Sequence, residues 1–132
     1  MITAPARPAR QVAAPVSVVQ PLGLLRVEGL ALCVLCIAAF LHLGGHWGYL
    51  FLGFAADLSF VGYLVGSRIG AALYNAVHST VLPIALVAAG FILNQPQATL
   101  TGLVLLAHIG FDRAAGYGLK YPDAFGHTHL DA

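Results

Sequence analysis

Residues 69–93 read IGAALYNAVHSTVLPIALVAAGFIL, a run without a single Asp, Glu, Lys or Arg. It belongs to a longer uncharged stretch between Arg68 and Asp112, and a second such stretch separates Glu28 from Asp57. An apolar run of about 20 residues is long enough to cross the hydrocarbon core of a bilayer as a helix. The run therefore predicts a membrane-spanning helix, and the same pattern recurs along the chain.

The composition of the whole chain agrees with a membrane protein. Its 132 residues are 59% hydrophobic and only 8% charged, whereas soluble domains carry about 25% charged residues. The net charge of +1 argues against a nucleic-acid partner. Cys33 and Cys36 form a lone C-x2-C inside an apolar run, which favours small packing residues over a zinc or redox site.

Four apolar segments are separated by three short turns that read GGH, GSR and NQPQ. Short turns make neighbouring helices antiparallel, and a spanning segment of this kind must satisfy its own backbone as a helix. We expect an all-α, four-helix transmembrane bundle with up-down connections over residues 22–118. A disordered tail over 1–21 and a cytoplasmic tail over 119–132 would flank it. The spans are expected at about 22–43, 47–65, 69–93 and 98–118.

Basic residues set the orientation of these four spans. In a bundle of this order all six fall on one side of the membrane: Arg7, Arg10, Arg26, Arg68, Arg113 and Lys120. The positive-inside rule makes that side cytoplasmic. We therefore expect a multi-pass protein of the bacterial inner membrane with both termini in the cytoplasm. Its expected partners are membrane lipids, with a second copy or another membrane protein left open.

Two local features concern the packing of the spans. Pro83 lacks a backbone donor and should kink the third span. Gly62, Gly66 and Gly70 lie four residues apart around the second turn, a spacing that suits a close approach of two helices.

Ionisable residues inside the spans are the expensive feature of this chain. Counted from the cytoplasmic ends, Asp57, His78, His108, Asp112 and Glu28 lie about 9–15 Å deep. His108 and Asp112 share one helix face, since they are four residues apart. Such residues normally face inward and are paired, so we expect the carboxylates of Asp57 and Asp112 to converge with both imidazoles.

Three functions remain open for this set of side chains. Two imidazoles and two or three carboxylates suit a divalent metal such as Zn, Mn or Fe, which could activate water. They also suit a proton or ion path. The third reading is a structural network, in which Asp57 pairs with Arg68 or Arg113. Arg113 itself is expected to reach headgroups or a neighbouring carboxylate, because it points about 100° away from Asp112.

The other histidines are expected to lie apart from this set. His42 and His46 flank an outer turn and are read as interfacial residues. His127 and His129 belong to the C-terminal tail and would contribute only if that tail folds back.

The C-terminal stretch carries a resemblance to a known family. Residues 110–131, GFDRAAGYGLKYPDAFGHTHLD, resemble the closing signature of the domain of unknown function 4260 family of small bacterial integral membrane proteins. The resemblance extends from LLRVEGLA through LSFVGYLVGSRIGAALYN-AVH to the final THL, over about residues 22–131. It implies a four-helix membrane protein and carries no activity.

A looser likeness concerns the polar residues themselves. D-L-S at Asp57, H-S at His78 and H-x3-D at His108 are similar to the ordered motifs of small inner-membrane metal-dependent hydrolases. The likeness implies that Asp57, His78, His108 and Asp112 hold the metal. Two positions depart from that pattern, because Ser59 replaces a second Asp and Val77 replaces a Thr.

The favoured hypothesis is therefore hydrolysis of a phospholipid or another membrane-borne ester. Ser59 and Asn75 would orient water or ligands, and Glu28 would be the general base if the first span closes the site. The alternatives are a non-enzymatic membrane subunit with a structural polar cluster, and a proton or ion carrier.

Overall fold

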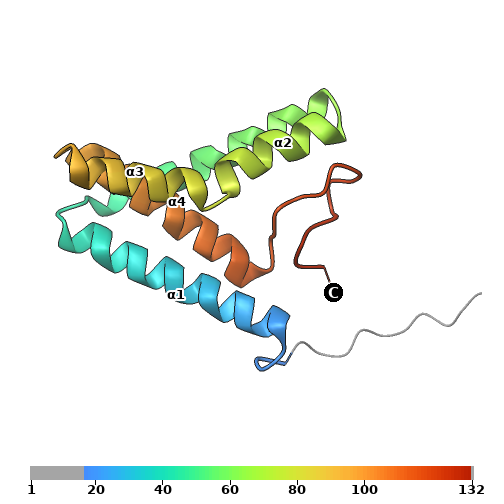
Figure 1. The fold of residues 1–132 in the computed structure, drawn as a ribbon, viewed down its shortest axis with the longest axis horizontal. Helices are drawn as coiled ribbons and strands as arrows, with labels where there is room; N and C mark the ends of the chain where they lie inside the picture. Colours follow the sequence, from blue (N-terminus) through green and yellow to red (C-terminus); the bar gives the residue numbers. More distant parts are fainter. Residues whose placement is uncertain (1–16, 132) are drawn as a thin grey trace, which may run out of the picture.

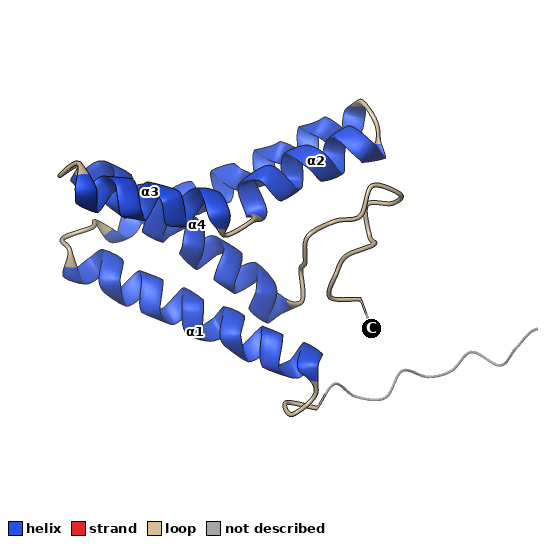
Figure 2. Cartoon of the chain, in the orientation of Figure 1, coloured by secondary structure: helices blue, strands red, loops and turns tan. Residues whose placement is uncertain are grey.

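The computed structural model of this protein describes residues 17–131, and these form an all-helical chain without a named strand (Figure 2). Most of the expected N-terminal tail, residues 1–16, lies outside the described part. The helices in chain order are α1 (Pro21–His42), η1 (Trp47–Leu64), α2 (Ser67–His78), α3 (Val81–Ile92) and α4 (Pro96–Ala115). Because α2 and α3 together form one interrupted span, the chain is the expected four-helix fold.

Three stretches of the described chain are long and apolar enough to cross a membrane. They are Pro21–His42, Trp47–Leu64 and Ser67–Ile92. This finding supports a membrane protein. The helix α4, expected as a fourth span, is not among them, because it carries several polar residues.

The position of α4 explains its composition. Figure 1 shows α4 between α1 on one side and α3 on the other, with α1 running antiparallel to it. Half of its 20 residues are buried: Thr99, Gly102, Leu103, Val104, Leu106, Ala107, His108, Ile109, Gly110 and Asp112. A helix that its neighbours shield from lipid can carry polar side chains at lower cost than a helix that faces lipid.

Glycines bring α1 and α4 into close contact. A Cβ atom added at Gly110 would lie 2.6 Å from the carbonyl oxygen of Gly29 and 2.6 Å from the backbone nitrogen of Cys33. Such distances leave no room for a side chain, so glycine is required at this crossing. Cys33 and Cys36 are free thiols buried at the same interface, which agrees with the expected packing role.

The second span differs from the expected α-helix, because η1 is a 3₁₀-helix throughout its 18 residues. Such helices are usually short, since side chains at i and i+3 eclipse one another. Here the buried positions Gly53, Ala56 and Gly62 are separated by multiples of three residues, and their small size reduces that clash. At about 2.0 Å per residue, η1 is about 36 Å long, against about 27 Å for an α-helix of the same length.

The turn between η1 and α2 confirms the expected close approach of glycines. A Cβ atom on Gly62 would lie 3.2 Å from the Cα atom of Gly70, and the ring of Tyr63 covers Gly70. Gly66 has a φ of 154°, a conformation that side chains disfavour.

The third span is interrupted where a kink was expected. Pro83 has no N–H for the carbonyl of Ser79, and its ring collides with that carbonyl in a regular helix. Ser79 accordingly adopts an extended conformation with ψ of 150°, and the chain divides into α2 and α3. The break lies next to His78, the last residue of α2.

The C-terminal tail folds back onto the helices. The side chain of Asn75 in α2 donates to the carbonyl of Lys120 over 2.8 Å and accepts from its backbone N–H over 2.7 Å. Lys120 also forms an isolated antiparallel bridge with Thr128, and Leu130 is buried. In Figure 1 the tail, in red, returns toward the first turn of α1.

Candidate metal centre

Four ionisable side chains from three helices meet beside the break between α2 and α3. Asp57 lies in η1, His78 ends α2, and His108 and Asp112 lie one turn apart in α4. One ligand atom from each side chain lies within 4.8 Å of all the others. We refer to these four residues as the Asp–His cluster. The structure thus brings together all the residues that the sequence suggested as metal ligands.

The contacts inside the Asp–His cluster are short and of similar length. Asp57 Oδ1 lies 3.2 Å from His78 Nε2 and 3.3 Å from His108 Nε2. Asp112 Oδ2 lies 3.6 Å from His78 Nε2 and 3.4 Å from His108 Nε2. Each carboxylate therefore faces both imidazoles.

These spacings match the edges of a metal coordination shell. Zinc binds nitrogen and oxygen ligands at about 2.0–2.2 Å, so the ligand atoms of a tetrahedral site lie about 3.3–3.6 Å apart. The four His–Asp distances, from 3.2 to 3.6 Å, fall in or next to that interval, and all four donor atoms lie within 4.8 Å of one another. The two contacts of Asp57 also fit hydrogen bonds with the imidazoles of His78 and His108.

His78 is held in the orientation that a metal ligand needs. Its Nδ1 lies 3.0 Å from the carbonyl oxygen of Tyr74. A carbonyl only accepts, so Nδ1 carries the proton, and the lone pair of a neutral ring lies on Nε2. The Tyr74 ring also stacks on the imidazole at 3.8 Å between centroids. Metal-binding histidines commonly donate their second N–H in this way.

The carboxylates of the Asp–His cluster need compensating positive charge, which protons on the imidazoles or a metal ion could supply. A neutral His78 would direct its lone pair at two carboxylates, an arrangement that is repulsive unless a proton or a metal ion lies between them. No Lys or Arg of the described residues forms an ion pair with Asp57 or Asp112. His78 is fully buried, and His108 and Asp112 are 7% and 8% exposed. One divalent ion would balance the two carboxylates without protonating either histidine.

Arg113 does not go where the sequence suggested. It was expected to reach headgroups or a carboxylate, but its guanidinium donates to the carbonyls of His78, over 3.1 Å, and Tyr117, over 2.8 Å. The reason is the break after α2, which leaves the last carbonyls of that helix without helical partners. A cation at a helix C-terminus is also favoured by the helix dipole. Arg113 thus fixes the helix end that carries His78.

Of the three residues proposed to assist catalysis, Glu28 lies apart from the Asp–His cluster. Glu28 is exposed and borders a different cavity with Thr80, Arg113 and His129, so the first span does not bring it to the cluster. The side chain of Asn75 is engaged by the Lys120 backbone. Ser59 Oγ is buried without a hydrogen-bond partner in the described chain. The placement of Glu28 therefore does not favour its suggested role as the general base.

The comparison with known families gives one result. The family model described as "Domain of unknown function (DUF4260)" matches residues 23–132. The chain belongs to this family. No curated protein and no solved structure matches the chain. The family has no stated function, so the chemistry of this member must be argued from its own residues.

A large cavity of this DUF4260 chain borders the Asp–His cluster. It has a volume of about 400 Å³ and includes Asp57, His108, Asp112 and Lys120 in its wall. The rest of the wall is aromatic: Phe54, Phe60, Tyr74, Phe111, Tyr117 and Phe125. Because Asp57 keeps 38% of its side chain exposed, the cluster can be reached from this space.

Sequence reasoning missed Tyr74 and Lys120 as members of this site. Tyr74 precedes His78 by four residues, so helical spacing could have revealed their contact. Lys120 lies beyond the last helix and enters the cavity only because the tail folds back, a contact without a local signal. The Lys120 ammonium donates to the carbonyl of Phe125 over 2.7 Å and lies 3.9 Å from the centroid of the Phe125 ring.

The remaining histidines do not join the Asp–His cluster. His127 pairs with Asp123 on the surface at 2.7 Å, and His129 accepts from the backbone N–H of Leu119 over 2.8 Å. His46 accepts from the backbone of Gly48 at the start of η1. The C-terminal tail does fold back onto the helices, but its two histidines contact Asp123 and Leu119 and not the Asp–His cluster.

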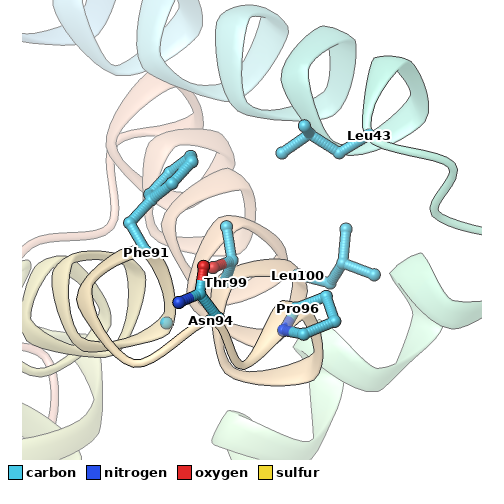
Figure 3. A pocket seen from close by; sticks show the side chains of 7 residues that line it. Leu43, Phe91, Asn94, Pro96, Thr99 and Leu100 are labelled. Atoms are coloured by element: carbon cyan, nitrogen blue, oxygen red, sulfur yellow. The ribbon is translucent and has the colours of Figure 1, made fainter.

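A second cavity lies near the turn between α3 and α4 (Figure 3). It measures about 250 Å³ and is lined by Leu43, Gly90, Phe91, Asn94, Pro96, Thr99 and Leu100. Figure 3 shows the amide of Asn94 next to the hydroxyl of Thr99 and apolar side chains around them. Since no ionisable group lines this cavity, it lacks the means for acid–base or metal chemistry.

Proposed function

We propose that this protein is a divalent-metal-dependent hydrolase that acts on a membrane-borne ester. The observation that carries the proposal is the Asp–His cluster, whose donor atoms have the spacing of a coordination shell. A buried group of two carboxylates and two imidazoles is costly in a membrane protein. A bound Zn, Mn or Fe ion would compensate that cost and would give the cluster a chemical purpose.

The chemistry follows from the cluster and its neighbouring cavity. Asp57, His78, His108 and Asp112 would hold the ion, which would supply a water of lowered pKa and polarise an ester oxygen. Four protein donors would complete a tetrahedral zinc site, so an open position for water would require a five- or six-coordinate ion. The cavity beside Asp57 and Asp112 gives an ester access to the cluster. The water oxygen would bond to the acyl carbon or phosphorus as the ester bond breaks, and the leaving alcohol would take the proton that the water releases.

The proposal includes a location. The six Lys and Arg residues favour the inner membrane with both termini in the cytoplasm. In that orientation the Asp–His cluster lies toward the cytoplasmic side of the bilayer. The proposed substrate would therefore come from the cytoplasmic leaflet.

A structural role is the second candidate, and the same contacts favour it. If both imidazoles are protonated, the Asp–His cluster is a hydrogen-bonded ion network that joins η1, α2 and α4. Such a network would fix the packing of these helices without any ligand. It requires no stoichiometric metal, and metal content therefore separates the two candidates.

The test uses the full chain purified in detergent and reconstituted into lipid nanodiscs. Elemental analysis should find about one Zn, Mn or Fe per chain, and a p-nitrophenyl acyl ester should be hydrolysed in a chelator-sensitive manner. His127→Ala, which alters an exposed histidine, should match wild type in both measurements. Wild-type protein that holds no metal after incubation with each of the three ions would overturn the proposal.

A further inference from the structure

The Asp–His cluster borders two cavities of opposite character. The aromatic cavity of about 400 Å³ contains Lys120. A different cavity, of about 170 Å³ and distinct from the one in Figure 3, is almost wholly apolar. Phe54, His108 and Phe111 border both of them. The two spaces therefore adjoin at His108, a member of the cluster.

The apolar cavity lies between two helices that face lipid. Cys33 and Ile37 of α1 form one wall, and Leu50 and Phe54 of η1 form the opposite wall. Both helices pack against α4, but they make few contacts with each other. The gap between α1 and η1 is thus a lateral entrance of the right polarity for a hydrocarbon chain.

The aromatic cavity contains a cation without an acidic partner. Lys120 is 8% exposed, and its ammonium forms no ion pair within residues 17–131. An ammonium has three donors, and the hydrogen bond to Phe125 uses one of them. Burial lowers the pKa of Lys120 and so opposes its charged form, and the charges of Asp131 and Asp112 offset this cost only in part. An anion in the cavity would offset that cost.

We propose that the substrate is an anionic amphiphile with one hydrocarbon chain, which enters between α1 and η1. The chain occupies the apolar cavity, the ester lies at the Asp–His cluster, and a phosphate or carboxylate binds Lys120. This inference rests on the proposed function, since it names the substrate class of the same site. The observations behind it are different ones, namely the buried Lys120 and the apolar cavity next to Cys33.

The native thiols provide a direct test of occupancy. Cys36→Ser leaves Cys33, in the wall of the apolar cavity, as the single cysteine. Alkylation of Cys33 by N-ethylmaleimide is followed by intact mass in nanodiscs loaded with dodecyl phosphate, laurate or dodecanol. At least one anionic probe should slow alkylation about tenfold more than dodecanol does, the effect of one charge-assisted contact. Sodium phosphate should have no effect, because it has no chain.

Lys120 variants test the anion contact. Lys120→Met should remove the advantage of the anionic probe over dodecanol, whereas Lys120→Arg should retain it. Both variants keep the backbone contacts with Asn75. Equal protection by all three probes, or full protection in Lys120→Met, would overturn the inference. Metal content of the same samples separates the two proposals, because a metal-free protein that still shows Lys120-dependent protection refutes the hydrolase alone.

Discussion

The molecule contains two His–Asp pairs of the same sequence spacing in opposite surroundings. His108 and Asp112 are four residues apart and lie 3.4 Å from each other, with side chains 4% and 11% exposed. Asp123 and His127 are also four residues apart and lie only 2.7 Å from each other, but they are 48% or more exposed. The closer pair is therefore the one at the surface.

Each pair also has an aromatic neighbour, so local chemistry does not distinguish them. The ring of Phe54 lies 5.4 Å from that of His108, and the ring of Tyr121 lies 4.5 Å from that of His127, both between centroids. The two pairs differ in their further partners, since only the buried pair lies next to a second His and a second Asp. An exposed ion pair contributes little, whereas buried charges persist only with several compensating partners.

The largest expected effect comes from removing one imidazole of each pair. His108→Ala should lower metal affinity by about 100-fold or more. It deletes one ligand, and it removes an imidazole that lies between the two negatively charged carboxylates. His127→Ala should leave metal affinity unchanged. Isothermal titration with Zn or Mn on nanodisc samples measures both. Equal losses in the two variants would show that the Asp–His cluster has no special role.

A smaller effect is expected from the aromatic neighbours. Tyr74→Leu removes the stack on His78 but keeps the carbonyl that holds Nδ1, so metal affinity should fall about tenfold, as for a supporting residue. Tyr121→Leu is the matched control and should bind metal as wild type does. An unchanged affinity in Tyr74→Leu would show that backbone geometry alone orients His78.

Much of the fold could be predicted from the sequence, because it depends on polarity. Uncharged runs marked the apolar spans, and the short turns fixed their antiparallel order. The convergence of Asp57, His78, His108 and Asp112 followed from the cost of ionisable groups in lipid. Each of these predictions rests on the spacing of residues along the sequence, which a helix converts directly into position along its axis and around its surface.

What could not be predicted depends on tertiary contacts. The 3₁₀ geometry of η1 arises from how Gly53, Ala56 and Gly62 fit their neighbours, and helix-type periodicity in the sequence gave no warning of it. Arg113 was misplaced because the break after His78 creates new acceptors. Glu28 was expected near the cluster on depth alone, but depth does not fix the face of a helix.

A local effect is expected where the tail joins the helices, between the two pairs. Asn75→Ala removes two hydrogen bonds with the Lys120 backbone and leaves partly buried groups unpaired, at a cost of about 1–3 kcal/mol. Limited trypsin digestion should cut the tail at Lys120 faster than in wild type. Metal affinity should be retained, because Asn75 does not contact the Asp–His cluster. If Asn75→Ala weakened metal binding as well as speeding cleavage of the tail, the tail would instead be part of the metal site.

The smallest expected effect is an acid transition of the exposed pair. The hydrogen bond from His127 holds the pKa of Asp123 below its ordinary value, and the backbone N–H of Thr128 does the same for Asp131. A carboxylate whose pKa is lowered by folding stabilises the fold above its unfolded pKa, and this stability is lost as the pH falls through the folded pKa. Amide protection in residues 119–131 should therefore weaken below about pH 4. In Asp123→Asn with Asp131→Asn, protection should already be weak at pH 6 and should change little with acid. Hydrogen exchange measures both, corrected for the intrinsic dependence of exchange on pH. A wild-type tail that keeps its protection to pH 2.5 would show that Asn75 and Lys120 hold it without help from the surface pair.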